Sequence, residues 1–185
     1  MFKSFKKDLA FRYGADAAEK IWERANEEYL RLEAAEPDAD RPSRSYVFPV
    51  VALYRATEQY APGEALAMMR AGGTRMGLKL KKTFRGITAL PGIPTLTWKN
   101  MDKIAAKLSE GYDVENFLVE KDKCFMDIVA CPLHDKAKAL GSPEAVQMIC
   151  CMDKEYMNGF RGIAYKRTKS VAEGDDCCDY RLTRQ

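Results

Sequence analysis

The sequence predicts an α+β protein, in which a helical N-terminal half packs on a C-terminal antiparallel sheet of about four strands. Apolar residues recur at helical spacing through the region that ends near Leu108. Segments rich in Phe, Val, Ile and Met follow only after Gly111. Glycine and proline divide that later region into the order β-β-α-α-β-β. The change of pattern near Gly111 therefore predicts where the sheet begins.

Length and composition fit one soluble globular domain. The chain has 185 residues, of which 46% are hydrophobic and 31% are charged, with a formal net charge of +3. We expect a single domain over 1–185, with a helical part over 1–111 and an α+β part over 112–185. No apolar run approaches the roughly 18 residues of a membrane-spanning helix, and the N-terminus lacks the apolar segment of a signal peptide. We therefore expect a cytoplasmic protein that has no membrane partner and keeps its six cysteines reduced.

Two short basic runs, Lys3–Lys7 and Lys79–Lys82, could contact phosphate. Basic and acidic residues are interleaved along the chain rather than blocked, which is typical of solvated helix faces. We therefore expect no nucleic-acid partner.

Helical periodicity and helix-breaking residues define the N-terminal elements. Ile21, Ala25 and Leu32 mark the buried face of a helix over 16–35, and Pro49 suits the first turn of a helix. Because glycine disfavours helix, Gly72-Gly73 predicts a break between two short helices. The further helices and loop that we expect are helix Phe48–Tyr60, helices Glu64–Arg70 and Thr74–Phe84, loop Leu90–Pro94 and helix Trp98–Leu108.

The C-terminal region reads as two hairpins separated by two helices. The first turn falls at Lys121–Lys123 and the second at Glu173-Gly174. Each predicted helix opens with proline near its first position. The elements are strands Glu115–Glu120 and Cys124–Ala130, helices Pro132–Leu140 and Pro143–Asn158, and strands Ile163–Val171 and Cys177–Thr183.

All six cysteines and the only histidine lie between Cys124 and Arg181. Cys131 lies where a strand meets a helix, so the N–H groups and the positive dipole at that helix start would favour its thiolate. Alternatively, Cys131 is a small buried hydrophobic residue, and its position does not decide between the two interpretations. Cys150 and Asp153 share a helix face, where the carboxylate could exchange a proton with the thiol.

Alternation in the last strand places Asp176, Cys178 and Tyr180 on one face. The other face carries Asp179 and Arg181, which we interpret as an exposed ion pair.

His134 follows Cys131 by three positions and could activate it, or it could be a surface residue. With Cys150 and Cys178 these two residues form a nominal zinc-binding set of three cysteines and one histidine. No C-x₂-C pair is present, so we expect no metal and no other cofactor.

At these residues the chain resembles the L-2-amino-thiazoline-4-carboxylic acid hydrolase family. The matching motifs are Cys131-Pro132, Gly141–Glu144, Cys150–Asp153, Arg167-Thr168 and Gly174–Arg181, with Ala52–Ala56 as a further likeness in the helical half. The chain departs from the family pattern at Cys151 and Cys177, which add a thiol beside each motif cysteine, and at Leu133 and His134.

The resemblance implies the same α+β fold and hydrolytic opening of a 2-aminothiazoline ring to a carbamoylated cysteine, on the route to L-cysteine. It places the catalytic role on motif positions: Cys131, Cys150, Asp153, Asp176 and Cys178. We expect these five residues to meet in one pocket. We assign substrate binding to Arg55, Arg167 and His134, because a substrate carboxylate requires a cation.

A different class of function is a non-catalytic module that holds a small apolar ligand in a pocket lined by cysteines. Both hypotheses have a small molecule as the partner. The sequence leaves the oligomeric state open, a homo-oligomer included.

Overall fold

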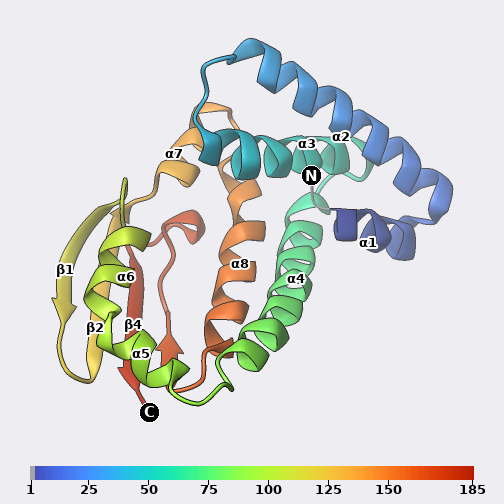
Figure 1. The fold of residues 1–185 in the computed structure, drawn as a ribbon. Coiled ribbons are helices and arrows are strands. Elements are labelled where there is room, and N and C mark those ends of the chain that lie inside the picture. Colours follow the sequence, from blue (N-terminus) through green and yellow to red (C-terminus); the bar gives the residue numbers. More distant parts are fainter. Residues whose placement is uncertain (1–2) are drawn as a thin grey trace. The chain divides into compact units, whose positions relative to one another are not determined.

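The computed structural model describes residues 3–185, and within that range it contains eight α-helices and one antiparallel sheet of four strands (Figure 1). Every strand in this range follows Tyr112, which confirms the predicted helical N-terminal half and C-terminal sheet. The chain divides into two compact units, Met1–Met76 with Leu133–Cys151 and Gly77–Pro132 with Met152–Gln185. The boundaries fall within three helices, and each unit is described by itself. A single domain over 1–185 stays a prediction.

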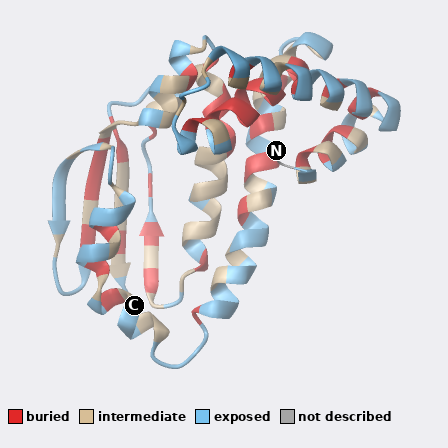
Figure 2. Ribbon diagram, turned by 45° about the horizontal axis from the view of Figure 1, so that its top comes forward, coloured by how far each residue is buried: buried red, intermediate tan, exposed pale blue. Residues whose placement is uncertain are grey.

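The first unit is helical in its described residues. Helix α3 (Phe48–Tyr60) carries a dense run of buried residues, and Val50, Val51 and Leu53 are fully buried (Figure 2). Pro49 lies in the first turn of α3, as predicted. The remaining elements are α1 (Lys3–Tyr13), α2 (Ala15–Ala35), the π-helical segment η1 (Ser43–Val47), the start of α4 (Ala65–Ile87), α7 (Pro132–Ala139), the 3-10 turn η2 (Pro143–Val146) and the start of α8 (Gln147–Tyr156).

Helix α4 contradicts the two short helices predicted around Gly72-Gly73, because it continues through both glycines. A Cβ atom at Gly73 would clash with the carbonyl oxygen of Met148 on α8, and one at Gly72 would lie 2.6 Å from the Phe5 ring. Close packing therefore requires glycine here. Glycine in a helix lowers stability by about 1 kcal/mol relative to alanine, and the close packing offsets that loss.

The second unit contains the sheet, whose strand order is β1-β2-β4-β3. Helices α5 and α6 lie against one face of it (Figure 1). The elements are α5 (Ile93–Lys99), α6 (Met101–Leu108), β1 (Asp113–Val119), β2 (Lys123–Ala130), the 3-10 turn η3 (Met157–Gly159), β3 (Ile163–Lys166), the 3-10 turn η4 (Val171–Glu173) and β4 (Cys178–Arg184).

Three further predicted elements differ from the structure. The predicted loop Leu90–Pro94 is shorter than expected, because α5 begins at Ile93, and the end of α5 and α6 replace the single helix Trp98–Leu108. Asn100 separates these helices, and its side-chain amide donates to the carbonyl of Leu96 at 2.8 Å. The single helix over Pro143–Asn158 is a 3-10 turn, α8 and a second 3-10 turn.

The first strand of the final hairpin is also shorter than predicted, and the second is shifted by one residue. β3 ends at Lys166, and β4 begins only at Cys178. Asp176 therefore precedes the strand and does not share a strand face with Cys178. The intervening chain turns at Gly174, which has a left-handed φ of 96°, and the carboxylate of Asp175 accepts the N–H of Ser170 at 2.7 Å.

Strand register determines which side chains face the helices. Met126 of β2 lies opposite Tyr180 of β4, and Ile128 lies opposite Cys178. Because side chains alternate, the inner face also receives Leu182. The buried cluster on this face consists of Trp98, Met101, Ala105, Cys124, Met126, Ile163, Tyr165 and Leu182. None of the helices in residues 3–185 combines the length and the apolar character needed to cross a membrane.

Candidate functional site

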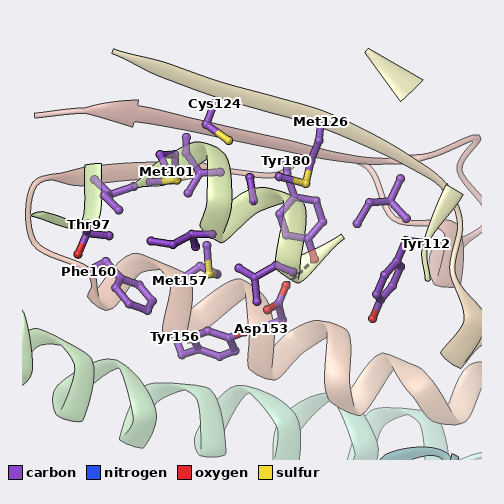
Figure 3. A pocket seen from close by; sticks show the side chains of 16 residues that line it. Thr97, Met101, Tyr112, Cys124, Met126, Asp153, Tyr156, Met157, Phe160 and Tyr180 are labelled. Atoms are coloured by element: carbon purple, nitrogen blue, oxygen red, sulfur yellow. Dashed lines mark hydrogen bonds between the residues drawn. The ribbon is translucent and has the colours of Figure 1, made fainter. Parts of the chain in front are cut away.

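A cavity of about 240 Å³ lies in the second unit, between the inner face of the sheet, α6 and the end of α8 (Figure 3). Its lining is mostly apolar: Met101, Ile104, Ala105, Leu108, Met126, Ile128, Met157, Phe160, Ile163 and Leu182. The polar or thiol-bearing lining residues are Thr97, Tyr112, Cys124, Asp153, Tyr156 and Tyr180. A small cavity with an apolar body and a few polar groups is typical of a small-ligand site.

Asp153 is the one carboxylate among the described residues that line this cavity. Its side chain is 18% exposed, and it points toward Tyr180 (Figure 3). The Tyr180 hydroxyl donates to Asp153 Oδ2 at 2.5 Å, and Arg167 Nη1 lies 3.4 Å from the same oxygen. The carboxylate is thus oriented by one phenol and one guanidinium.

Arg167 follows β3, and its side chain is only 6% exposed. Its Nη1 donates to the Tyr180 hydroxyl at 3.1 Å, and its guanidinium carbon lies 5.5 Å from the centre of the Tyr180 ring. A buried guanidinium needs such a carboxylate, because the desolvation of an unpaired ion costs roughly several kcal/mol. The opposite charges of Arg167 and Asp153 therefore offset the cost of burying each of them.

Three phenols around this carboxylate stay protonated at neutral pH. Burial raises the pKa of Tyr156, Tyr165 and Tyr180 above the usual value, and the negative charge of Asp153 raises it further. Tyr165 packs beside Tyr180, with ring centres 5.7 Å apart. Tyr156 and Tyr180, which line the cavity, are consequently neutral hydrogen-bonding groups.

The cavity reaches solvent at the end of α6. Leu108 lines it although this side chain is 65% exposed, whereas Cys124 at another part of the lining is fully buried. Burial also raises the pKa of the Cys124 thiol, which keeps this sulphur neutral. Leu108 thus marks the mouth.

The model of the L-2-amino-thiazoline-4-carboxylic acid hydrolase family matches residues 41–182. The chain belongs to this family. The matched range contains every residue that lines the cavity and each of the motifs on which the resemblance was based. Comparison with curated proteins gives no match. Membership in the family supports a hydrolase and leaves the reaction to be proposed.

Of the five residues to which the family resemblance assigned catalysis, Asp153 lines the cavity. Cys178 is buried on β4, where its sulphur accepts the N–H of Val171 at 3.3 Å. Cys131 is half-buried between β2 and α7, as the sequence indicated. Cys150 lies on α8 within the first unit. The meeting of the three cysteines in one pocket stays a prediction.

Asp176, the fifth of these residues, is exposed at the surface, with a side chain that is 74% accessible. Its carboxylate is 2.8 Å from the ammonium group of Lys169, and this hydrogen bond lowers the pKa of Asp176. Asp176 is exposed because it lies in the turn before β4, where the alternation of the strand does not extend.

The three residues assigned to substrate binding are not among the residues that line the cavity. In the first unit, Arg55 contacts Glu28 at 2.5 Å and Ser142 Oγ at 3.1 Å. His134 lies on α7 in the same unit. Arg167 contacts the lining residues Asp153 and Tyr180.

The predicted ion pair between Asp179 and Arg181 was wrong. Asp179 instead accepts the N–H of Thr168 at 2.7 Å and its hydroxyl at 2.6 Å, while Arg181 pairs with Asp127 of β2 at 2.5 Å. Residues two apart on a strand lie about 7 Å apart on one face, and diagonal neighbours on the adjacent strand lie at a similar distance. Asp127 on β2 can therefore take the place of Asp179 as the partner of Arg181. These contacts tie the Arg167-Thr168 motif to the last strand.

Sequence reasoning missed Tyr180 as a site residue, although the aromatic position of the Gly174–Arg181 motif and the strand alternation both pointed to it. Tyr156 was missed as well, because it carries no motif. Among residues 3–185 no group of three or more His, Cys, Asp or Glu side chains is arranged to hold a metal ion.

Proposed function

We propose that the protein is a hydrolase that opens the ring of a 2-aminothiazoline, converting 2-amino-thiazoline-4-carboxylate to a carbamoylated cysteine. The observation that carries the proposal is the carboxylate of Asp153, which lines an apolar cavity and is held by Tyr180 at 2.5 Å. Membership of the chain in the hydrolase family supports it.

The chemistry needs a nucleophile and a proton carrier. Carbon 2 of the ring is bonded to two nitrogens and one sulphur, which makes it amidine-like and electrophilic. Asp153 accepts a proton from water as the water oxygen bonds to carbon 2. The bond between carbon 2 and sulphur then breaks, and the sulphur leaves with a proton. One water is consumed, both nitrogens remain in the carbamoyl product, and one thiol is formed.

Tyr180 and Arg167 act as positioning residues in this scheme. The neutral phenol of Tyr180 holds the carboxylate in one orientation, and the guanidinium of Arg167 balances its charge. The apolar lining excludes bulk water and thereby strengthens the pairing of the carboxylate with a cationic ring. A carboxylate that is oriented and charge-balanced before the reaction begins is preorganised for it.

A thiol nucleophile from Cys131, Cys150 or Cys178 is the alternative route to the same product. The thiolate would bond to carbon 2 in place of water, and water would then resolve the covalent adduct. Mass spectrometry of protein quenched during turnover separates the two routes, because only the thiol route adds the mass of the substrate to the chain.

The decisive experiment incubates a catalytic amount of the protein with 2-amino-thiazoline-4-carboxylate and quantifies carbamoyl-cysteine by mass spectrometry. Asp153→Asn should lower kcat/KM by about a hundredfold or more, because the proton acceptor is lost. Glu155→Gln, on the same helix but outside the cavity lining, is the matched control and should retain activity. Absence of turnover by the unaltered protein, or full activity of Asp153→Asn, would refute the proposal.

A second candidate is a module that binds a small ligand without turning it over. The mostly apolar lining favours it. Saturable binding of 2-aminothiazolines together with no product after long incubation would select this candidate.

A further inference from the structure

We propose that Tyr156 is a second catalytic residue of this cavity, whose hydroxyl donates a hydrogen bond to the oxygen that water adds to carbon 2 of the ring. The proposal rests on the proposed function, in which Asp153 takes a proton from water while no residue is assigned to the oxygen that remains. A donor at that oxygen would stabilise the charge that develops on it during the reaction.

Tyr156 lies beside Asp153 at the wall of the cavity. It is the last residue of α8, one turn after Asp153, so the two side chains share a face of that helix. Both residues line the cavity (Figure 3). Burial, the negative charge of Asp153 and hydrogen bonding to Asp153, in this order, raise the pKa of Tyr156. The phenol oxygen is therefore close to the carboxylate that takes a proton from water.

The ring of Tyr156 is held by aromatic neighbours within the second unit. Its centre lies 5.4 Å from that of Phe84 on α4, and Phe84 stacks in turn on Phe160, with ring centres 4.6 Å apart. Such aromatic pairs fix the position of a ring beyond what burial alone does. A phenol that is held in this way needs little reorganisation to reach a reacting oxygen, which is the condition for stabilising a transition state.

The carboxylate of Asp153 uses its two oxygens differently. Tyr180 and Arg167 both contact Oδ2, so the orientation and the charge of the carboxylate are fixed from that side. A carboxylate has a second oxygen with lone pairs of its own, and Oδ1 is the atom to which we assign the proton from water. The water oxygen then lies between Oδ1 and the hydroxyl of Tyr156.

The reaction balances without a proton from Tyr156. The water oxygen bonds to carbon 2, the bond between carbon 2 and sulphur breaks, and the two protons of water end on the ring nitrogen and on the sulphur. The oxygen becomes the carbonyl oxygen of the carbamoyl product. Because the pKa of Tyr156 is raised, the phenol keeps its own proton and remains a donor throughout. Asp153 accepts hydrogen bonds less strongly once it is protonated, so the bond from Tyr156 to the new oxygen strengthens along the reaction.

Calorimetric titration with two unreactive ligands tests this contact without turnover. Carbamoyl-alanine resembles the product and presents its carbonyl oxygen, whereas thiocarbamoyl-alanine presents sulphur, a weaker acceptor, at the same position. Tyr156→Phe should weaken the binding of carbamoyl-alanine about three- to tenfold and change that of thiocarbamoyl-alanine by less than about twofold. Equal weakening of both ligands, no weakening of either, or no binding of carbamoyl-alanine by the unaltered protein would overturn the proposal.

Turnover of 2-amino-thiazoline-4-carboxylate provides a second test. Tyr156→Phe should lower kcat about ten- to a hundredfold and change KM by less than about threefold, because the hydrogen bond forms only as the oxygen is added. Tyr165→Phe also removes the hydroxyl of a buried phenol, but Tyr165 does not line the cavity, so this matched control should retain kcat. An equal loss in both variants would assign the effect to packing and contradict the role of Tyr156.

The outcomes also separate this proposal from the proposed function. If Tyr156→Phe selectively weakens the binding of carbamoyl-alanine to a protein that does not open the ring, the hydrolase is removed and Tyr156 is kept as a residue that binds a carbonyl oxygen. Ring opening with an unchanged kcat in Tyr156→Phe would keep the hydrolase and remove the catalytic role of Tyr156.

Discussion

The phenol of Tyr180 donates a hydrogen bond of 2.5 Å to the carboxylate of Asp153, across 27 positions of sequence. This contact joins β4 to the end of α8 within the second unit. It gives the carboxylate one orientation at the wall of the cavity. The relationship makes Tyr180 the most informative residue to alter.

Tyr180→Phe should lower kcat/KM for a 2-aminothiazoline about ten- to a hundredfold, because a hydrogen bond to a charged group is lost. The ring remains to pack against Arg167 and Tyr165, so the protein should still fold. If Tyr180 positions the carboxylate for reaction, most of the loss should appear in kcat rather than KM. Tyr46→Phe, at a side chain that is 46% exposed, is the control and should change neither parameter.

Gly77→Ala should lower the free energy of unfolding by about 1–3 kcal/mol, because the added methyl would meet the Cβ of Glu155 at 2.6 Å and the carbonyl of Met152. Gly86→Ala in the same helix meets nothing within 4 Å and should raise it by about 0.4–1 kcal/mol. Chemical denaturation measures both variants. Stabilisation by Gly77→Ala would show that α4 and α8 do not pack as closely as described within the second unit.

Tyr156, Tyr165 and Tyr180 should ionise only as the protein unfolds in alkali. Their folded-state pKa values are raised, chiefly by burial, so the neutral phenols contribute stability below about pH 10, and this contribution is lost as pH rises further. Phenolate absorbance should therefore rise in two phases, and the second phase should coincide with loss of the folded far-ultraviolet circular dichroism. A single phase that precedes unfolding contradicts this assignment.

Asp179→Asn should destabilise the protein at neutral pH and lose this effect in acid. Burial acts to raise the pKa of Asp179, but hydrogen bonds from Thr168 and Lys169 outweigh it, and the net pKa is lowered. A depressed folded-state pKa stabilises above about pH 4, and that stability is lost as pH falls through the folded-state pKa. The difference in Tm from the unaltered protein should accordingly shrink below about pH 4. A difference that is independent of pH would assign the effect to packing.

Thiol titration of the freshly purified protein, denatured without reductant, should detect close to six thiols. In the folded protein Cys124 should react slowest, because it is fully buried and burial raises its pKa. Cys124→Ser should remove the slow phase. A count of four or fewer in the denatured protein would show that disulfides form.

The sequence by itself determined the C-terminal order β-β-α-α-β-β and the point at which strands replace helices. These features depend on local periodicity and turn residues, which is why β1 begins at Asp113, close to the predicted change at Gly111. The face that Tyr180 shares with Cys178 followed from the same alternation. Asp153 was found because its motif lies on one helix, and the family model confirmed the family to which that motif belongs.

Tertiary structure alone decided which of these residues share a cavity. Tyr180 meets Asp153 only because β4 pairs with β2 and β3 in one register, and no local pattern encodes contacts between segments far apart in sequence. Asp176 lies on the surface because it is two residues before the start of β4 at Cys178. The prediction at Gly72-Gly73 failed for the same reason. Intrinsic helix propensity predicts a break there, but it does not include contacts with distant residues. The close approach of Met148 makes glycine necessary at Gly73, so packing within the first unit overrides that propensity.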